Sequence, residues 1–257
     1  PVNGGNAKLI VGGSAFHGQP KFSPDGKKIL YVSDLSGSDE LWTIDVNGYN
    51  SKQLTSIKAD ILLSPVWDLD QENVYVTSVQ GAFNRRAKLL KIDLSNGKED
   101  PLLVDSKSQA SKLISAPAAG PYMSGIRKSD NHVLYTSVIP RAYGMRQGST
   151  SQAMILDPKL NKTRKIPLEK YNAMKPLFSS DGKWLVYATE SQGQTGLRIQ
   201  EVHTGKERWL AFPFQRNELE ARASRDVVPN FAISNDCKFV FTAFGGKIHQ
   251  INIQSLE

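Results

Sequence analysis

PKFSPDGKKILYVSDLSGSDELWTIDVNGYNSKQLT, residues 20–55, has the pattern of one antiparallel four-stranded sheet. Its first turn is Pro24-Asp25-Gly26, in which proline presets its own φ and glycine tolerates a positive φ. Asn47-Gly48 stands between two alternating apolar runs, which is the strongest short sequence signal for a β-hairpin. The four strands are predicted at 21–23, 29–32, 41–46 and 52–54.

The same pattern recurs along the chain at spacings of roughly 50 residues, which is typical of a repeat fold. A Pro-x-apolar triplet heads each copy, and a polar turn and β-rich runs follow it. The triplets are Pro20-Lys21-Phe22, Pro65-Val66-Trp67, Pro121-Tyr122-Met123, Pro176-Leu177-Phe178 and Pro229-Asn230-Phe231. Sheets repeated in this way predict an all-β fold, a β-propeller of four-stranded antiparallel blades. One propeller domain is expected over residues 1–257, with five visible blades at about 20–55, 65–104, 121–167, 176–211 and 229–253.

The two ends of the chain leave the closure of the ring open. The fifth unit ends with its third strand, whereas residues 7–11 are expected to form a lone edge strand. That strand could complete the fifth blade, which would remove an exposed sheet edge. Alternatively, the chain is part of a six-bladed parent and one blade lies outside it. Because Pro1 is not an initiator residue, we expect a processed or truncated chain with any signal peptide outside it.

The first turn of each unit carries a local prediction. Gly26 and Gly182 follow an aspartate at a position where a positive φ is expected. Gln71 and Cys237 stand at the equivalent positions of the second and fifth units. Since a side chain disfavours positive φ, these two turns are predicted to be strained or altered.

Composition narrows the possible functions. The net charge is +7, but the lysines sit in short turns and form no long run or helical stripe, so we expect no nucleic-acid partner. No segment reaches the roughly 18 apolar residues of a membrane helix, so no membrane insertion is expected. The single Cys237 excludes an internal disulfide and does not identify a compartment.

The repeat resembles that of a known family. PKFSPDGKKILYVSDLSGSDELWTIDVNG is similar to the TolB-type propeller repeat, also called the WD40-like or PD40 repeat, and PLFSSDGKWLVYATE is a weaker copy. Residues 4–34 and 210–253 resemble the propeller region that precedes the metal-dependent hydrolase domain of TolB-like amidohydrolases. The chain departs from that pattern at Asn235, where proline is usual, and at Cys237, where glycine is usual.

The resemblance implies a non-catalytic docking or interaction module, a fragment of an amidohydrolase-type hydrolase. It implies a metal ion only in a hydrolase domain outside this chain, and a periplasmic or secreted location. The alternative is a free-standing periplasmic TolB-like protein that binds other proteins. In both cases the partner is a protein or a fused hydrolase domain.

The residues themselves contain no recognisable catalytic motif. His17, His132, His203 and His249 are isolated, without the clustered ligands of a metal-dependent hydrolase. No Gly-x-Ser-x-Gly pentapeptide, phosphate loop or Cys-x-x-Cys pair occurs. Asp34, Asp68 and Asp70 could suggest calcium, but turn aspartates usually bond nearby backbone. We therefore expect no catalytic residue, metal or cofactor in this chain; an active site in the propeller channel is a third, less favoured hypothesis.

Propeller geometry predicts where binding would occur. Loops between strands two and three, and between consecutive blades, leave one face, and the long segments 79–87, 105–120, 138–152 and 211–228 all belong to it. Arginine and aromatic side chains are favoured at protein interfaces. The candidate docking residues are Arg85, Arg86, Arg141, Tyr143, Arg146, Arg216, Arg222 and Arg225, with Phe83 and Phe214 beside them. They either dock an acidic partner or pair locally with Glu218, Glu220 and Asp226.

Overall fold

The computed structural model describes residues 6–80, 86–102, 122–139, 150–170, 172–216 and 230–254. Over these ranges the chain forms five antiparallel sheets, four with four strands and the last with three. Blade 1 contains β1 (His17–Phe22), β2 (Lys28–Ser33), β3 (Glu40–Asp45) and β4 (Lys52–Gln53); blade 2 contains β5 (Ile61–Trp67), β6 (Asn73–Gln80), β7 (Arg86–Asp93) and β8 (Glu99–Pro101). Blade 3 contains β9 (Tyr122–Arg127), β10 (His132–Ile139), β11 (Thr150–Asp157) and β12 (Lys162–Lys165). Blade 4 contains β13 (Met174–Phe178), β14 (Trp184–Ser191), β15 (Gln194–Glu201) and β16 (Glu207–Arg216), and blade 5 contains β17 (Phe231–Ile233), β18 (Phe239–Phe244) and β19 (Lys247–Asn252).

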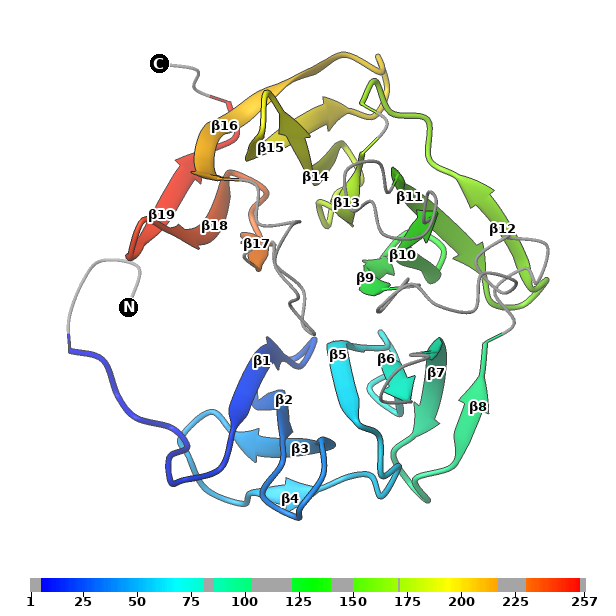
Figure 1. Cartoon of the computed structure of the whole chain (residues 1–257), viewed down its shortest axis with the longest axis vertical. Coiled ribbons are helices and arrows are strands. Elements are labelled where there is room, and N and C mark those ends of the chain that lie inside the picture. The colour runs from blue at the N-terminus through cyan, green and yellow to red at the C-terminus, as the bar shows by residue number, and fades with distance from the viewer. Residues whose placement is uncertain are drawn as a thin grey trace.

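The five sheets are arranged around a central axis as the blades of a propeller (Figure 1). The first strand of each blade, β1, β5, β9, β13 or β17, lies nearest the axis, and the later strands follow outward. The predicted all-β propeller with five visible blades is therefore confirmed. No helix in the described ranges has the length and apolar character that crossing a membrane requires.

Alternating side chains on the strands form the core between neighbouring blades. In blade 2, Val74 and Val76 pack toward blade 1, whereas Tyr75 packs toward blade 3. Further buried clusters join blades 3 and 4 around Leu134 and Tyr187 and blades 4 and 5 around Val186 and Val240. Because side chains alternate between the two faces of a sheet, a blade can pack one face against the preceding blade and the other against the following blade.

The turn prediction is confirmed at all four positions. Gly26 and Gly182 both have a φ of 73°, and Gln71 and Cys237 have φ values of 59° and 58°. The two side chains therefore sit in a left-handed conformation that costs roughly 1–2 kcal/mol for an ordinary residue. In three of these turns a serine donates to an aspartate two residues later, at Ser23, Ser179 and Ser234. In blade 1, Ser23 Oγ donates to Asp25 Oδ1 at 2.6 Å, and Lys28 N donates to Ser23 Oγ at 2.9 Å.

Two expectations require correction. Residues 7–11 form no strand; instead, Lys8 Nζ donates to the Asn47 carbonyl oxygen at 2.8 Å.

The second correction concerns the Pro-x-apolar triplets, two of which are offset from the other three. In blade 1, Phe22 of the first strand pairs with Ile29 of the second strand. The corresponding pairs are Ile126 with Val133 in blade 3 and Ile233 with Val240 in blade 5. The equivalents of Phe22 are therefore Ile126 and Ile233, and not Met123 and Phe231.

Candidate functional site

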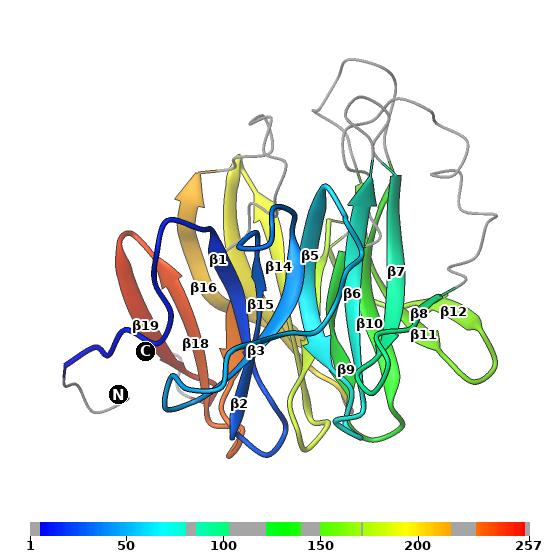
Figure 2. The same cartoon turned by 90° about the horizontal axis from the view of Figure 1, so that it is seen from below.

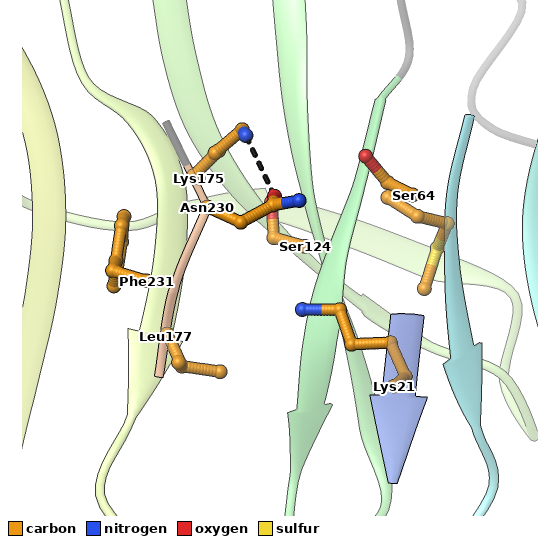
Figure 3. Close-up of a pocket in the computed structure, with 8 residues that line it drawn as sticks. Lys21, Ser64, Ser124, Lys175, Leu177, Asn230 and Phe231 are labelled. Carbon is orange, nitrogen blue, oxygen red and sulfur yellow. Dashed lines mark hydrogen bonds between the residues drawn. The ribbon is translucent and has the colours of Figure 1, made fainter. Parts of the chain in front are cut away.

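A small cavity of about 20 Å³ lies in the central channel, between the innermost strands (Figure 3). All five blades contribute to its wall, because each innermost strand faces the axis. Its lining residues are Lys21, Ser64, Met123, Ser124, Lys175, Leu177, Asn230 and Phe231. These residues include two lysines and no acidic residue, so the wall carries positive charge.

A β-bulge in the innermost strands shapes this wall. Gln19, Ser64 and Lys175 each have a positive φ, between 51° and 56°, and each precedes a proline. The pairing of β1 with β2, of β5 with β6 and of β13 with β14 shifts at these residues. A bulge of this kind re-aims side chains and backbone groups. It therefore turns groups of the innermost strands toward the channel and toward the neighbouring blade.

The bulged backbone is bonded to the preceding blade. Ser64 N donates to Gln19 Oε1 of blade 1 at 2.5 Å. Lys175 N of blade 4 donates to Thr136 Oγ1 of blade 3 at 2.9 Å, and Met123 N of blade 3 donates to Thr77 Oγ1 of blade 2 at 2.9 Å. These hydrogen bonds fix the relative positions of the blades beside the channel.

Two lysines point into the cavity. Lys175 Nζ donates to Asn230 Oδ1 at 2.9 Å, and Lys21 projects toward the same region from β1 (Figure 3). Ser124 Oγ is buried and has no hydrogen-bond partner in the described part of the chain. Sequence reasoning missed both lysines, although each is next to the proline of its innermost strand, which is the signal that could have found them.

Of the predicted docking residues, the structure describes the backbone of two that stand at strand ends. β7 begins at Arg86, paired with Gln80, and β16 ends at Arg216, paired with Gln194. These ends lie at the same end of the propeller (Figure 2). The side chains of Arg86 and Arg216 are outside the described residues, as are Arg85, Arg141, Tyr143, Arg146, Arg222 and Arg225 together with Phe83 and Phe214. The contacts of this set therefore stay a prediction.

His132, His249 and Asp68 each contact nearby groups. His132 lies between Asp130 and Asp157, at 2.9 and 3.4 Å, and His249 stacks on Phe244 with ring centroids 3.7 Å apart. Asp68 accepts hydrogen bonds from the Tyr75 hydroxyl and from Leu69 N, and the burial of Tyr75 beside this carboxylate raises the pKa of its phenol. Within the described ranges, no three His, Cys, Asp or Glu side chains are grouped to hold a metal ion.

The arrangement of blades is shared with known structures. No family model matches the chain. The structure superposes on TolB from Acinetobacter baumannii with a TM-score of 0.68, at 17% sequence identity, over 96% of this chain and 57% of that chain. The chain has the TolB propeller fold. A putative TolB from Agrobacterium tumefaciens matches this TolB-like chain with a TM-score of 0.62, at 12% identity, over 95% of it and 83% of the neighbour.

Two other proteins are similar to this TolB-like chain. Oligogalacturonate lyase from Vibrio parahaemolyticus matches with a TM-score of 0.55, at 12% identity, over 96% of this chain and 81% of the lyase. By sequence, the chain is 24% identical over 170 residues to a protein of Bacillus subtilis (strain 168) described as "Uncharacterized peptidase YuxL". That match covers 66% of this chain and 21% of the peptidase, so the chain spans about a fifth of its curated relative.

Proposed function

We infer that this chain is a non-catalytic, TolB-like docking module that holds an acidic segment of a protein partner or of a fused domain. In the finer form of the proposal, the fused domain is an amidohydrolase-type hydrolase that carries its own metal ion, and the protein is periplasmic or secreted. The fold, shared with TolB, supports the interaction role. The similarity to one fifth of a larger peptidase supports attachment to a hydrolytic domain.

One observation carries the docking proposal: Lys175 of the channel and the arginines at two strand ends lie toward the same face. Lys175 is the second residue of β13, so it lies near the end at which the innermost strands begin. Arg86 begins β7 and Arg216 ends β16 at this same face (Figure 2). We name it the docking face. The tight turns that contain Lys27 and Lys183 lie at the opposite face.

An acidic partner fits this placement for two reasons. Complementary charge steers association and fixes register more than it adds affinity. Arginine also contributes strongly where an interface is desolvated. The competing explanation is that the arginines pair with Glu218, Glu220 and Asp226 of the same chain, in which case the face would attract an acidic segment weakly.

A charge-reversal pair separates the two explanations. The probe is a fluorescein-labelled deca-glutamate peptide, titrated at about 0.05 M salt, at which exposed charges are least screened. The variant Arg86→Glu/Arg216→Glu is expected to weaken binding about tenfold, because exposed pairs contribute up to about 1 kcal/mol each and reversal adds repulsion. The matched control Lys27→Glu/Lys183→Glu makes the same charge change at two exposed turn lysines and is expected to change binding less than twofold. Equal losses in both variants, or no loss in the first, would contradict a specific docking face.

A free-standing TolB-like binding protein is the second candidate. It is favoured by the match to the putative Agrobacterium tumefaciens TolB, of which this chain covers 83%. Amide hydrolysis by the natural full-length protein, with metal added and then chelated, distinguishes the two. Metal-dependent hydrolysis would support the fused form, whereas a full-length protein without a hydrolase domain would support the free-standing form.

A further inference from the structure

The cavity in the central channel collects hydrogen-bond donors. Lys21 of β1 and Lys175 of β13 direct their ammonium groups into it (Figure 3). An ammonium group has three donors and no acceptor. The described residues that line the cavity include no aspartate and no glutamate. A ligand that suits this wall accepts hydrogen bonds and carries negative charge.

The side-chain amide of Asn230 contributes a further donor. Its Oδ1 accepts a hydrogen bond from Lys175 Nζ at 2.9 Å. The acceptor end of the amide is therefore used, and the other end, Nδ2, can only donate. Figure 3 shows this nitrogen turned away from Lys175. Because Asn230 directly precedes β17, blade 5 supplies this donor.

The hydroxyl of Ser124 is the clearest sign of a ligand. Ser124 lies in β9 of blade 3, its Oγ is buried, and it has no hydrogen-bond partner in the described part of the chain. A buried hydroxyl that lacks a partner destabilises a folded protein, so most buried polar groups are hydrogen-bonded. A bound ion that accepts a hydrogen bond from Ser124 would remove this cost.

Backbone conformation directs one of the ammonium groups into the cavity. Lys175 has a φ of 51°, and the pairing of β13 with β14 shifts between Met174 and Leu177. A bulge of this kind changes the direction of the side chain that it carries. Ser64, on the opposite side of the cavity, has a φ of 52°. Strained residues of this kind are frequent at ligand sites.

The size of the cavity determines the kind of anion that it accepts. Its volume is about 20 Å³. A cavity holds one water molecule when its volume on this scale reaches roughly 10–15 Å³. The space therefore suits a single ion not much larger than water. Sulfate and phosphate, which carry four oxygens each, are too large for it.

We propose that the channel cavity binds one chloride ion. The ion is held by the ammonium groups of Lys21 and Lys175, by the hydroxyl of Ser124 and by Nδ2 of Asn230. Two ammonium groups directed at one cavity repel each other, and an anion between them replaces this repulsion with two attractions. Because the four residues belong to blades 1, 3, 4 and 5, the bound ion links these blades across the channel and stabilises the ring.

The linewidth of the chloride NMR signal tests this binding directly, because exchange with a slowly tumbling bound ion broadens the signal. Lys175→Gln and Ser124→Ala are each expected to reduce the broadening about twofold or more, because each removes a donor to the anion. The matched control is Lys183→Gln, which removes the same charge at an exposed turn lysine and should leave the broadening unchanged. Equal broadening in Lys175→Gln and Lys183→Gln would overturn the proposal, because it would indicate an adventitious ion only.

Thermal unfolding provides a second readout, in sodium chloride and in sodium gluconate at the same ionic strength. Gluconate is too large for the cavity. Chloride is expected to raise the Tm by roughly 3 °C over gluconate, because a ligand of the folded state alone stabilises that state. The difference should disappear in Lys175→Gln, and since both salts are compared within one variant, any intrinsic loss of stability cancels. Equal Tm values in the two salts for the wild type would overturn the proposal.

Discussion

The side chains of Arg198 and Glu207 face each other across β15 and β16, only 7% and 2% exposed, with Arg198 Nε 3.4 Å from Glu207 Oε2. The Tyr187 hydroxyl also donates to Glu207, and the Arg198 guanidinium lies 5.2 Å from the centre of the Trp209 ring. The guanidinium is therefore the buried partner of this carboxylate. Neither residue was singled out by sequence reasoning.

Removing the cation should therefore destabilise blade 4 strongly. Arg198→Met is expected to lower the free energy of unfolding by about 3–5 kcal/mol, since it leaves a buried carboxylate uncompensated. Arg198→Met/Glu207→Gln should recover more than half of this loss. Urea unfolding measures both values, and Lys98→Met, at an exposed pair with Asp100, is the control expected to change little. A double variant no more stable than Arg198→Met would contradict this account.

Glu40 is a second buried carboxylate, held by backbone amides. Its oxygens accept hydrogen bonds from Ile57 N at 2.9 Å, from Lys58 N at 2.8 Å and from the Thr55 hydroxyl at 2.6 Å. Glu40→Gln should cost about 1–3 kcal/mol, because its amide group places a donor against backbone donors. Thermal or urea unfolding tests this, with Glu72→Gln on an exposed turn as the control; equal stabilities of the two variants would contradict the assigned role of Glu40.

The strained turns give a prediction with the opposite sign. Gln71→Gly should raise the free energy of unfolding by about 0.5–1 kcal/mol, because glycine relieves the positive φ while adding some freedom to the unfolded chain. Gly26→Ala, at the equivalent position of blade 1, should lower it by about 1 kcal/mol. Equilibrium unfolding in urea measures both changes. Destabilisation by Gln71→Gly would show that the side chain stabilises the turn despite its φ.

The repeated turns also predict how stability depends on pH. Hydrogen bonds from Ser23, Ser179 and Ser234 hold the pKa values of Asp25, Asp181 and Asp236 below the usual range of aspartate. A carboxyl group whose pKa is lowered by folding stabilises the protein above its unfolded pKa, and the stabilisation is lost as the pH falls through the folded pKa. The variant Asp25→Asn/Asp181→Asn/Asp236→Asn should therefore be less stable than the wild type at pH 7, and the difference should shrink as the pH falls below about 4. A difference that stays constant down to pH 2 would exclude these carboxylates as its source.

The sequence predicted the blades well because their signals are local. The alternation of apolar and polar residues along a strand depends on a few adjacent positions, and so do the Asp-Gly and Asn-Gly turns. The strands accordingly lie close to where these signals predicted them. The offset of the Pro121 triplet could not be foreseen in this way. Its register depends on a bulge at Ser124, and a bulge adds one residue without changing the apolar pattern.

Features that need long-range partners were predicted less well. Leu9-Ile10-Val11 has the composition of a strand, but a strand requires the edge of another sheet, and the structure gives this segment no such partner. The channel lysines Lys21 and Lys175 come together only because the ring brings five innermost strands to one axis. The contacts of the arginines on the docking face depend on loop conformation, which no short pattern specifies.

The central claim, that the docking face binds a protein segment, is tested most directly by amide hydrogen exchange. Residues 1–257 alone are compared with the same residues in the natural full-length protein or in complex with its captured partner. The account predicts slower exchange in peptides that cover 79–87 and 211–228, and unchanged exchange in the opposite turns at 24–27 and 180–183. Protection confined to those turns, or equal exchange at both faces, would contradict it.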